Sequence, residues 1–213
     1  HIYRLYTVCR ADISIEKKRD AYIVAYFLQK RHSYSEKSAA VTEVHMEGYA
    51  YYNGVFAPAD EIRVPLTDRA LFFGDGVYDA AVGYRGRIYR YEDHMARLLG
   101  NARRVGLPLP VSECELREII QKVCAECATP FFLYIQLSRY SDERVHDYPD
   151  TERANLLVTA RKFTFPDKNS KQKLITVNDE RHTMCDIKTL CLLPAGLAAK
   201  EAGRHGATEA VFH

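Results

Sequence analysis

One lysine in this sequence stands in a setting that suits amine chemistry. Lys188 lies between the apolar side chains of Ile187 and Leu190, after a strand-like run at 174–177 and before an alanine-rich helical pattern over 192–202. Partial burial lowers the pKa of a lysine because it disfavours the ammonium form. A neutral amine is what a lysine needs to form a Schiff base with a carbonyl group. Lys188 is therefore a candidate nucleophile, although a solvated lysine near a strand end has the same local sequence.

Other residue types that can do chemistry give weaker indications. Cys124 and Cys127 form a single C-x-x-C pair, whereas a zinc site needs a second pair or neighbouring histidines, so we expect thiols and no metal. His94 lies at the start of a predicted helix and is expected to be structural. Asp75 and Asp79 do not form a catalytic pair by spacing alone.

The elements that position these side chains follow from the hydrophobic pattern. Asn53-Gly54 is a strong hairpin signal, because both central residues of a type I′ turn need positive φ. Ser112 and Glu115 have the spacing of a capping box at a helix start. Strands are expected at 49–52, 54–56, 61–66, 77–84, 87–90, 131–138 and 155–160, and helices at 91–105 and 112–127. This order predicts an α+β fold, with mostly antiparallel strands and two helices on one side.

The chain divides into four predicted parts. Residues 1–47 have no readable role, and 48–162 form the small α+β domain. A linker at 163–170 leads into a second domain at 171–213. A strand that begins in the last residues cannot bury itself alone, so this second domain is expected to be incomplete.

Composition limits the classes of partner. The chain has 213 residues and a net charge of +2, so a nucleic acid or an anionic membrane is not expected as the main partner. No apolar run is long enough to span a bilayer. Six cysteines in a chain of this length are expected to be reduced thiols, which favours a cytoplasmic protein.

Several separated blocks occur in an order that resembles the fold-type IV pyridoxal-phosphate enzymes. These include the branched-chain and D-amino-acid aminotransferases and aminodeoxychorismate lyase. The blocks are 73–79, 86–89, 92–98 and 185–190. The resemblance runs from about residue 48 to residue 213, and it implies pyridoxal 5′-phosphate as cofactor. It also implies a small α+β domain followed by the start of the larger cofactor-binding domain.

The resemblance assigns roles to individual residues. Lys188 would hold the cofactor as a Schiff base and carry the Cα proton. Arg97 matches the family's phosphate arginine, and a guanidinium suits a phosphate through bidentate hydrogen bonds. Arg144, His146 and Tyr78 match the residues that bind the substrate α-carboxylate in D-amino-acid aminotransferases. In that subfamily the Arg-x-His loop reaches the active site of the neighbouring subunit, which implies a homodimer.

The implied reaction moves an amino group from a D-amino acid, such as D-alanine, to a 2-oxo acid, such as 2-oxoglutarate. Branched-chain aminotransferase and aminodeoxychorismate lyase are same-fold alternatives, and the Arg144-x-His146 loop disfavours the lyase. A non-catalytic dimerisation or scaffold remnant is a further alternative. Cys191 and Ala195 stand where the family commonly has asparagine. The family's glutamate that pairs with the pyridine nitrogen has no match before His213.

Overall fold

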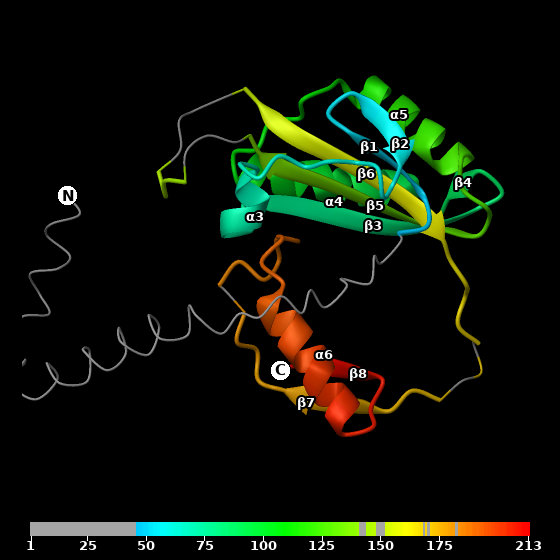
Figure 1. Cartoon of the computed structure of the whole chain (residues 1–213). Coiled ribbons are helices and arrows are strands. Elements are labelled where there is room, and N and C mark those ends of the chain that lie inside the picture. Colours follow the sequence, from blue (N-terminus) through cyan, green and yellow to red (C-terminus); the bar gives the residue numbers. More distant parts are fainter. Residues whose placement is uncertain (1–45, 141–143, 148–151, 168, 170, 182) are drawn as a thin grey trace, which may run out of the picture. The chain divides into compact units, whose positions relative to one another are not determined.

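The structure is a computed structural model, and it describes residues 46–140, 144–147, 152–167, 169, 171–181 and 183–213 (Figure 1). The described residues all belong to one compact unit that runs from residue 45 to residue 213. The N-terminal segment, for which the sequence predicts no role, therefore lies almost entirely outside the described residues. The domain boundaries placed after 162 and 170 stay predictions.

A six-stranded sheet forms the framework of the unit that the structure describes. Its strands lie in the order β2-β1-β6-β5-β3-β4, and every neighbouring pair is antiparallel. They are β1 (Tyr49–Tyr52), β2 (Val55–Pro58), β3 (Gly76–Tyr84), β4 (Arg87–Ile88), β5 (Phe131–Arg139) and β6 (Ala154–Lys162). The antiparallel α+β architecture predicted from the sequence is confirmed.

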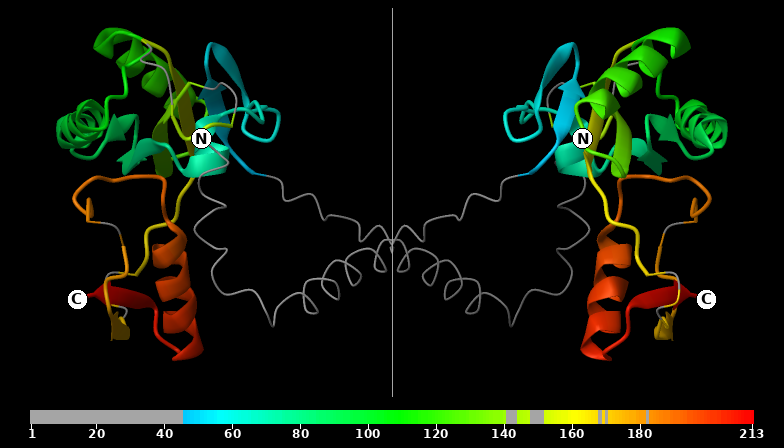
Figure 2. Two further views of the ribbon diagram at one scale, coloured as in Figure 1. Left: turned by 90° about the vertical axis from the view of Figure 1, so that its left-hand side faces the viewer. Right: turned by 90° about the vertical axis from the view of Figure 1, so that its right-hand side faces the viewer.

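Two helices, α4 (Tyr91–Arg104) and α5 (Glu113–Ala125), cover one face of this sheet (Figure 2). The reciprocal capping box predicted at the start of α5 is present. Alternate side chains of β5 point into the layer below the helices, as the two-residue period of a strand requires. The fully buried ones are Phe131, Leu133, Ile135 and Leu137. This layer is the hydrophobic core, and it fixes the strands on which the site is built.

The first hairpin follows the sequence, whereas the strand expected after it does not form. Asn53 and Gly54 both have positive φ, at 44° and 98°, as the predicted turn requires. Residues 61–66 form no strand. Nearly all of them are exposed, so an alternating pattern there has no core to face. Pro65 also lacks the N–H that would join a ladder.

A short helix, α3 (Arg69–Phe73), lies where no helix is predicted from the sequence. Asp68 caps it and is completely buried. The Asp68 carboxylate accepts hydrogen bonds from donors on α3, β1, β5 and β6: Ala70 N, Tyr52 Oη, Ser138 Oγ and Asn155 Nδ2. Burial raises the pKa of Tyr52, and the Asp68 charge raises it further. One carboxylate therefore ties α3 to three strands of the sheet.

The C-terminal part contains β7 (Leu174–Val177), α6 (Leu193–Arg204) and β8 (Glu209–Phe212). β7 and β8 pair in parallel. Parallel neighbours need a crossover connection, and here that connection contains α6. Across the described ranges, no helix is long and apolar enough to cross a membrane.

Candidate active site

The backbone around Lys188 is held against the first residues of β3. β4 pairs with β3 only at the C-terminal end of β3. At the N-terminal end of β3, the Tyr78 N–H donates to the Lys188 carbonyl over 3.0 Å, and the Leu190 N–H donates to the Gly76 carbonyl over 3.1 Å. The lysine segment therefore extends the sheet by a short bridge, which fixes where the Lys188 side chain begins.

The Lys188 side chain lies against a tyrosine. Ile187 is only 5% exposed and belongs to the core. The backbone turns at Lys188, where the Thr189 N–H donates to the Ile187 carbonyl over 2.9 Å. Lys188 Nζ donates to the Tyr78 hydroxyl over 3.0 Å and lies 4.1 Å from the centre of its ring. The Tyr78 ring stacks on Tyr134, with ring centres 5.4 Å apart. The amine is thus oriented by an aromatic side chain that is itself packed in place.

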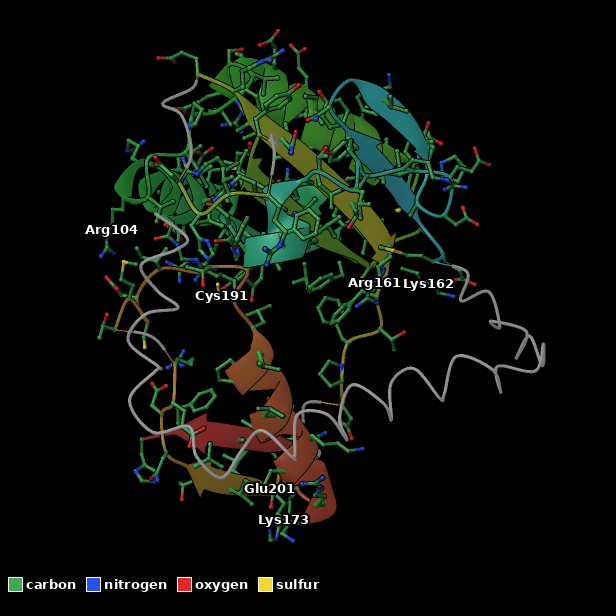
Figure 3. All side chains as sticks on the ribbon, turned by 60° about the vertical axis from the view of Figure 1, so that its left-hand side comes forward. Arg104, Arg161, Lys162, Lys173, Cys191 and Glu201 are labelled. Atoms are coloured by element: carbon green, nitrogen blue, oxygen red, sulfur yellow. The ribbon has the colours of Figure 1, made fainter. Side chains whose placement is uncertain are left out.

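A surface ion pair gives the lysine segment a second attachment. Arg104, at the end of α4 (Figure 3), bonds to Asp186 two residues before Lys188. The bond from Arg104 lowers the pKa of the Asp186 carboxyl. Both side chains are more than half exposed. Exposed pairs stabilise a fold only weakly, so we assign the positioning of Lys188 mainly to its backbone bonds.

Replacing Gly76 with alanine should disturb this attachment. A Cβ at Gly76 would lie 2.5 Å from the Leu137 carbonyl oxygen and 2.6 Å from Leu190 Cδ1. We expect a loss of about 1–3 kcal/mol in the free energy of unfolding, as overpacking commonly costs. Urea unfolding measures it. Gly100→Ala on α4 is the control, because a Cβ there meets nothing within 4 Å. Equal stability of the two variants would contradict the close fit at Gly76.

Arg97 forms a bidentate ion pair with the buried carboxylate of Asp79. Its Nε donates to Asp79 Oδ2 over 2.7 Å, and its Nη2 donates to Oδ1 over 2.9 Å. His94 Nδ1 lies 2.7 Å from the same Oδ1. Burial of Asp79 raises its pKa, but the hydrogen bonds from Arg97 and His94 outweigh this, and the pKa is lowered overall. The bond to Asp79 in turn raises the pKa of Arg97. No pattern in the sequence indicated this role of Asp79.

The lowered pKa of Asp79 makes a prediction about acid stability. A carboxyl whose pKa is lower in the folded state stabilises the fold above its unfolded pKa, and this contribution is lost as the pH falls through the folded pKa. The stability difference between the wild type and Asp79→Asn should therefore be constant above the ordinary value of 3.8 and shrink below it. Urea unfolding across this range measures it, with Glu118→Gln as an exposed control. A difference that grows toward acid pH would contradict the assignment.

A cavity of about 380 Å³ joins these side chains. It lies within the size range of small-molecule sites. Lys188, Tyr78 and Arg97 all line it, so three of the five predicted site residues meet in one place. An amine can form a Schiff base with a carbonyl group, and a guanidinium can bind a phosphate through paired hydrogen bonds. The donor set therefore fits pyridoxal phosphate.

The other two predicted residues lie elsewhere. Arg144 and His146 do not line this cavity. The Arg144 guanidinium and the His146 ring each lie 5.4 Å from the centre of the Phe73 ring. Arg69 donates to the Val145 carbonyl over 2.7 Å and to the His146 carbonyl over 3.3 Å. The described residues 144–147 are thus anchored beside α3.

The cavity wall also includes Arg181 and Cys191, for which no role is predicted from the sequence. Arg181 lines the cavity, and two of its nitrogens bond to Asp179, which lowers the pKa of that carboxyl to about 2. Cys191, in the segment that leads into α6 (Figure 3), also lines it. Its Sγ lies 3.8 Å and 3.7 Å from the carbonyl oxygens of Phe73 and Gly74. Cys191, which stands where the family commonly has asparagine, therefore contacts the end of α3.

The C-x-x-C pair is packed against the sheet. Burial raises the pKa of the Cys124 thiol to about 12. Cys127 Sγ donates to the Ala160 carbonyl over 2.9 Å. In the part of the chain that the structure describes, no group of three or more His, Cys, Asp or Glu side chains is arranged to hold a metal ion.

Comparison with known proteins identifies the class to which this fold and site belong. Residues 76–213 match the amino-transferase class IV family. The chain therefore belongs to this family, whose members have fold type IV and depend on pyridoxal phosphate. The resemblance inferred from the sequence blocks is confirmed.

Within that family, the chain is related to D-alanine aminotransferases. It is 34% identical over 168 residues to the D-alanine aminotransferase of Listeria monocytogenes, covering 76% of this chain and 58% of the relative. It is also 34% identical over 167 residues to the D-alanine aminotransferase of Staphylococcus aureus strain MSSA476, covering 76% and 59%. The chain thus spans less than two thirds of the length of these curated relatives.

Solved structures of the family share the fold. The branched-chain aminotransferase of Thermoproteus uzoniensis with norvaline superposes with a TM-score of 0.65 at 24% identity, covering 78% of this chain and 60% of that one. A fold IV transaminase from Curtobacterium pusillum gives 0.63 at 20% identity, covering 74% and 56%.

Proposed function

We propose that this chain is a pyridoxal-phosphate-dependent aminotransferase that takes the amino group of a D-amino acid, such as D-alanine, and gives it to a 2-oxo acid, such as 2-oxoglutarate. The supporting observation is the Lys188 amine, 3.0 Å from the Tyr78 hydroxyl in a cavity that Arg97 also lines. The relationship to D-alanine aminotransferases supports the choice of donor.

The side chains have distinct tasks in this reaction. When bound, pyridoxal phosphate supplies a carbonyl group that condenses with amines and a ring that withdraws electrons. Lys188 Nζ would be the amine that holds the cofactor, and it would also be the base that takes the Cα proton of the substrate. The Tyr78 hydroxyl orients this nitrogen. Arg97 directs N–H groups toward the phosphate.

Arg144, His146 and Tyr78 are proposed to bind the substrate carboxylate. Arginine and histidine together supply several donors for one carboxylate. Because Arg144 and His146 do not line the Lys188 cavity of their own chain, we propose that they serve the site of a second copy in a homodimer.

The first test is covalent trapping. The purified chain is mixed with pyridoxal phosphate, reduced with borohydride and mapped by peptide mass spectrometry, and we expect the label on Lys188. Turnover with D-alanine and 2-oxoglutarate is then compared with turnover of L-leucine and of aminodeoxychorismate. Preference for L-leucine would favour a branched-chain aminotransferase, and pyruvate release from aminodeoxychorismate would favour the lyase. A folded chain that takes no label would favour the non-catalytic alternative.

The second test asks whether two chains share each site. Lys188→Ala and Arg144→Ala chains are purified separately, unfolded, mixed in equal amounts and refolded together. Half of the dimers are then mixed, and each mixed dimer keeps one intact site, so activity should return to about a quarter of the wild-type value. Activity that stays at the level of the separate variants would place Arg144 in the site of its own chain.

A further inference from the structure

We propose that Asp79 and His94 are positioning residues that hold the Arg97 guanidinium so that its remaining N–H groups face the cavity. This inference rests on the proposed function, in which Arg97 binds the cofactor phosphate. Neither Asp79 nor His94 lines the cavity, so both would act through Arg97.

Asp79 is placed to fix the plane of the guanidinium. The Arg97 side chain is 51% exposed, whereas that of Asp79 is 1% exposed. A long, half-exposed arginine has many accessible rotamers, and immobilising it costs conformational entropy. Two parallel hydrogen bonds to a rigid carboxylate select one orientation. The carboxylate itself is held on β3, where its Oδ1 also accepts the Ala80 N–H over 2.8 Å.

The bonds to Asp79 leave three N–H groups of Arg97 available to a ligand. A guanidinium has five N–H groups in one plane. Asp79 takes the Nε–H and one Nη2–H of Arg97. Both Nη1–H groups and the second Nη2–H point away from Asp79. Because Arg97 lines the cavity, these groups form a planar set of donors suited to a phosphate.

His94 completes the arrangement. It stands one helical turn before Arg97 on α4, so both side chains reach the same carboxylate. A carboxylate only accepts hydrogen bonds, so the 2.7 Å contact requires a hydrogen on His94 Nδ1. That nitrogen therefore cannot accept from Arg97 Nη2, which lies 3.4 Å away. His94 thus holds Asp79 in place and leaves the third Arg97 donor available.

The experiment compares two ligands that differ only in the phosphate. Dissociation constants of pyridoxal phosphate and of pyridoxal are measured by fluorescence titration. In Asp79→Asn we expect affinity for pyridoxal phosphate to fall about tenfold or more, as loss of a charged hydrogen-bonded partner implies, with pyridoxal affinity unchanged. Glu92→Gln is the matched control, an exposed carboxylate in the first turn of α4 that pairs with Arg117.

A pair of His94 variants separates positioning from general packing. Asparagine places an amide N–H near the position of Nδ1, whereas leucine has no donor. We expect His94→Asn to keep the preference for pyridoxal phosphate over pyridoxal and His94→Leu to lose a large part of it. This pair also keeps the inference testable if Asp79→Asn does not fold.

The outcomes separate this inference from the proposed function. A wild type that binds both ligands equally would overturn the phosphate role of Arg97 and the inference with it. A wild type that prefers pyridoxal phosphate, with the preference unchanged in Asp79→Asn and His94→Leu, would overturn the positioning role alone. Equal weakening for both ligands would also overturn it, because it would indicate damage to the whole cavity.

Discussion

Replacing Lys188 with alanine is expected to abolish covalent trapping of pyridoxal phosphate and to lower transamination by a factor of about a hundred or more. The variant loses the amine that holds the cofactor and the base that moves the Cα proton, and a positioned base alone contributes about 10²–10⁴-fold. The fold should persist, because the segment is held by backbone bonds at Tyr78 and Leu190 that the substitution leaves in place. Mass spectrometry after borohydride reduction and a coupled assay for the 2-oxo acid measure the two effects.

The control for this experiment is Lys200→Ala, which removes an exposed lysine on α6. It should trap the cofactor as the wild type does. Restoration of turnover in Lys188→Ala by a small added amine would support the role as a base. Unchanged trapping in Lys188→Ala, with the label on another lysine, would refute the assignment of this residue.

Replacing Asp68 with alanine is expected to give the largest loss of stability among substitutions outside the cavity. Asp68 is 0% exposed, and its carboxylate is shared by side chains on β1, β5 and β6. Removing it leaves three buried donors without their acceptor, and one such group costs about 1–3 kcal/mol. The cap of α3 is lost as well. We expect a decrease of about 3 kcal/mol or more in the free energy of unfolding.

Equilibrium urea unfolding followed by circular dichroism measures this decrease. Glu118→Ala, at an exposed position on α5, is the matched control and should change stability by only about 0.5 kcal/mol or less. Tyr52→Phe removes one donor and should cost less than Asp68→Ala. If Asp68→Ala were as stable as Glu118→Ala, the buried network would not contribute to the fold as the structure implies.

The local elements of this fold were largely readable from the sequence. The turn at Asn53 and Gly54 and the capping box of α5 depend on neighbouring residues, and both form as predicted. The strand predicted at 61–66 does not form, because nearly all of these side chains are exposed and none is packed in the hydrophobic core. The helix α3 was missed because its capping residue, Asp68, is fixed by strands that are distant in the chain.

The candidate site was readable only in part. The sequence blocks pointed to Lys188, Arg97 and Tyr78, and the structure brings these three to one cavity. No role was predicted for Asp79, because its spacing from Asp75 does not indicate a catalytic pair of carboxylates. Its function as the partner of Arg97 depends on α4 packing across β3, which local spacing does not encode.

The sequence by itself indicated the family, most of the element types and the candidate lysine, since periodicity, turn residues and short blocks are properties of neighbours in the chain. Only the tertiary structure decided which side chains meet. Lys188 and Tyr78 are 110 positions apart, and they touch because the lysine segment pairs with the open end of β3 in one register. A shift of this pairing by one residue would place a different residue opposite Val77. The chemistry of this site is therefore set by strand register, which is a long-range property of the fold.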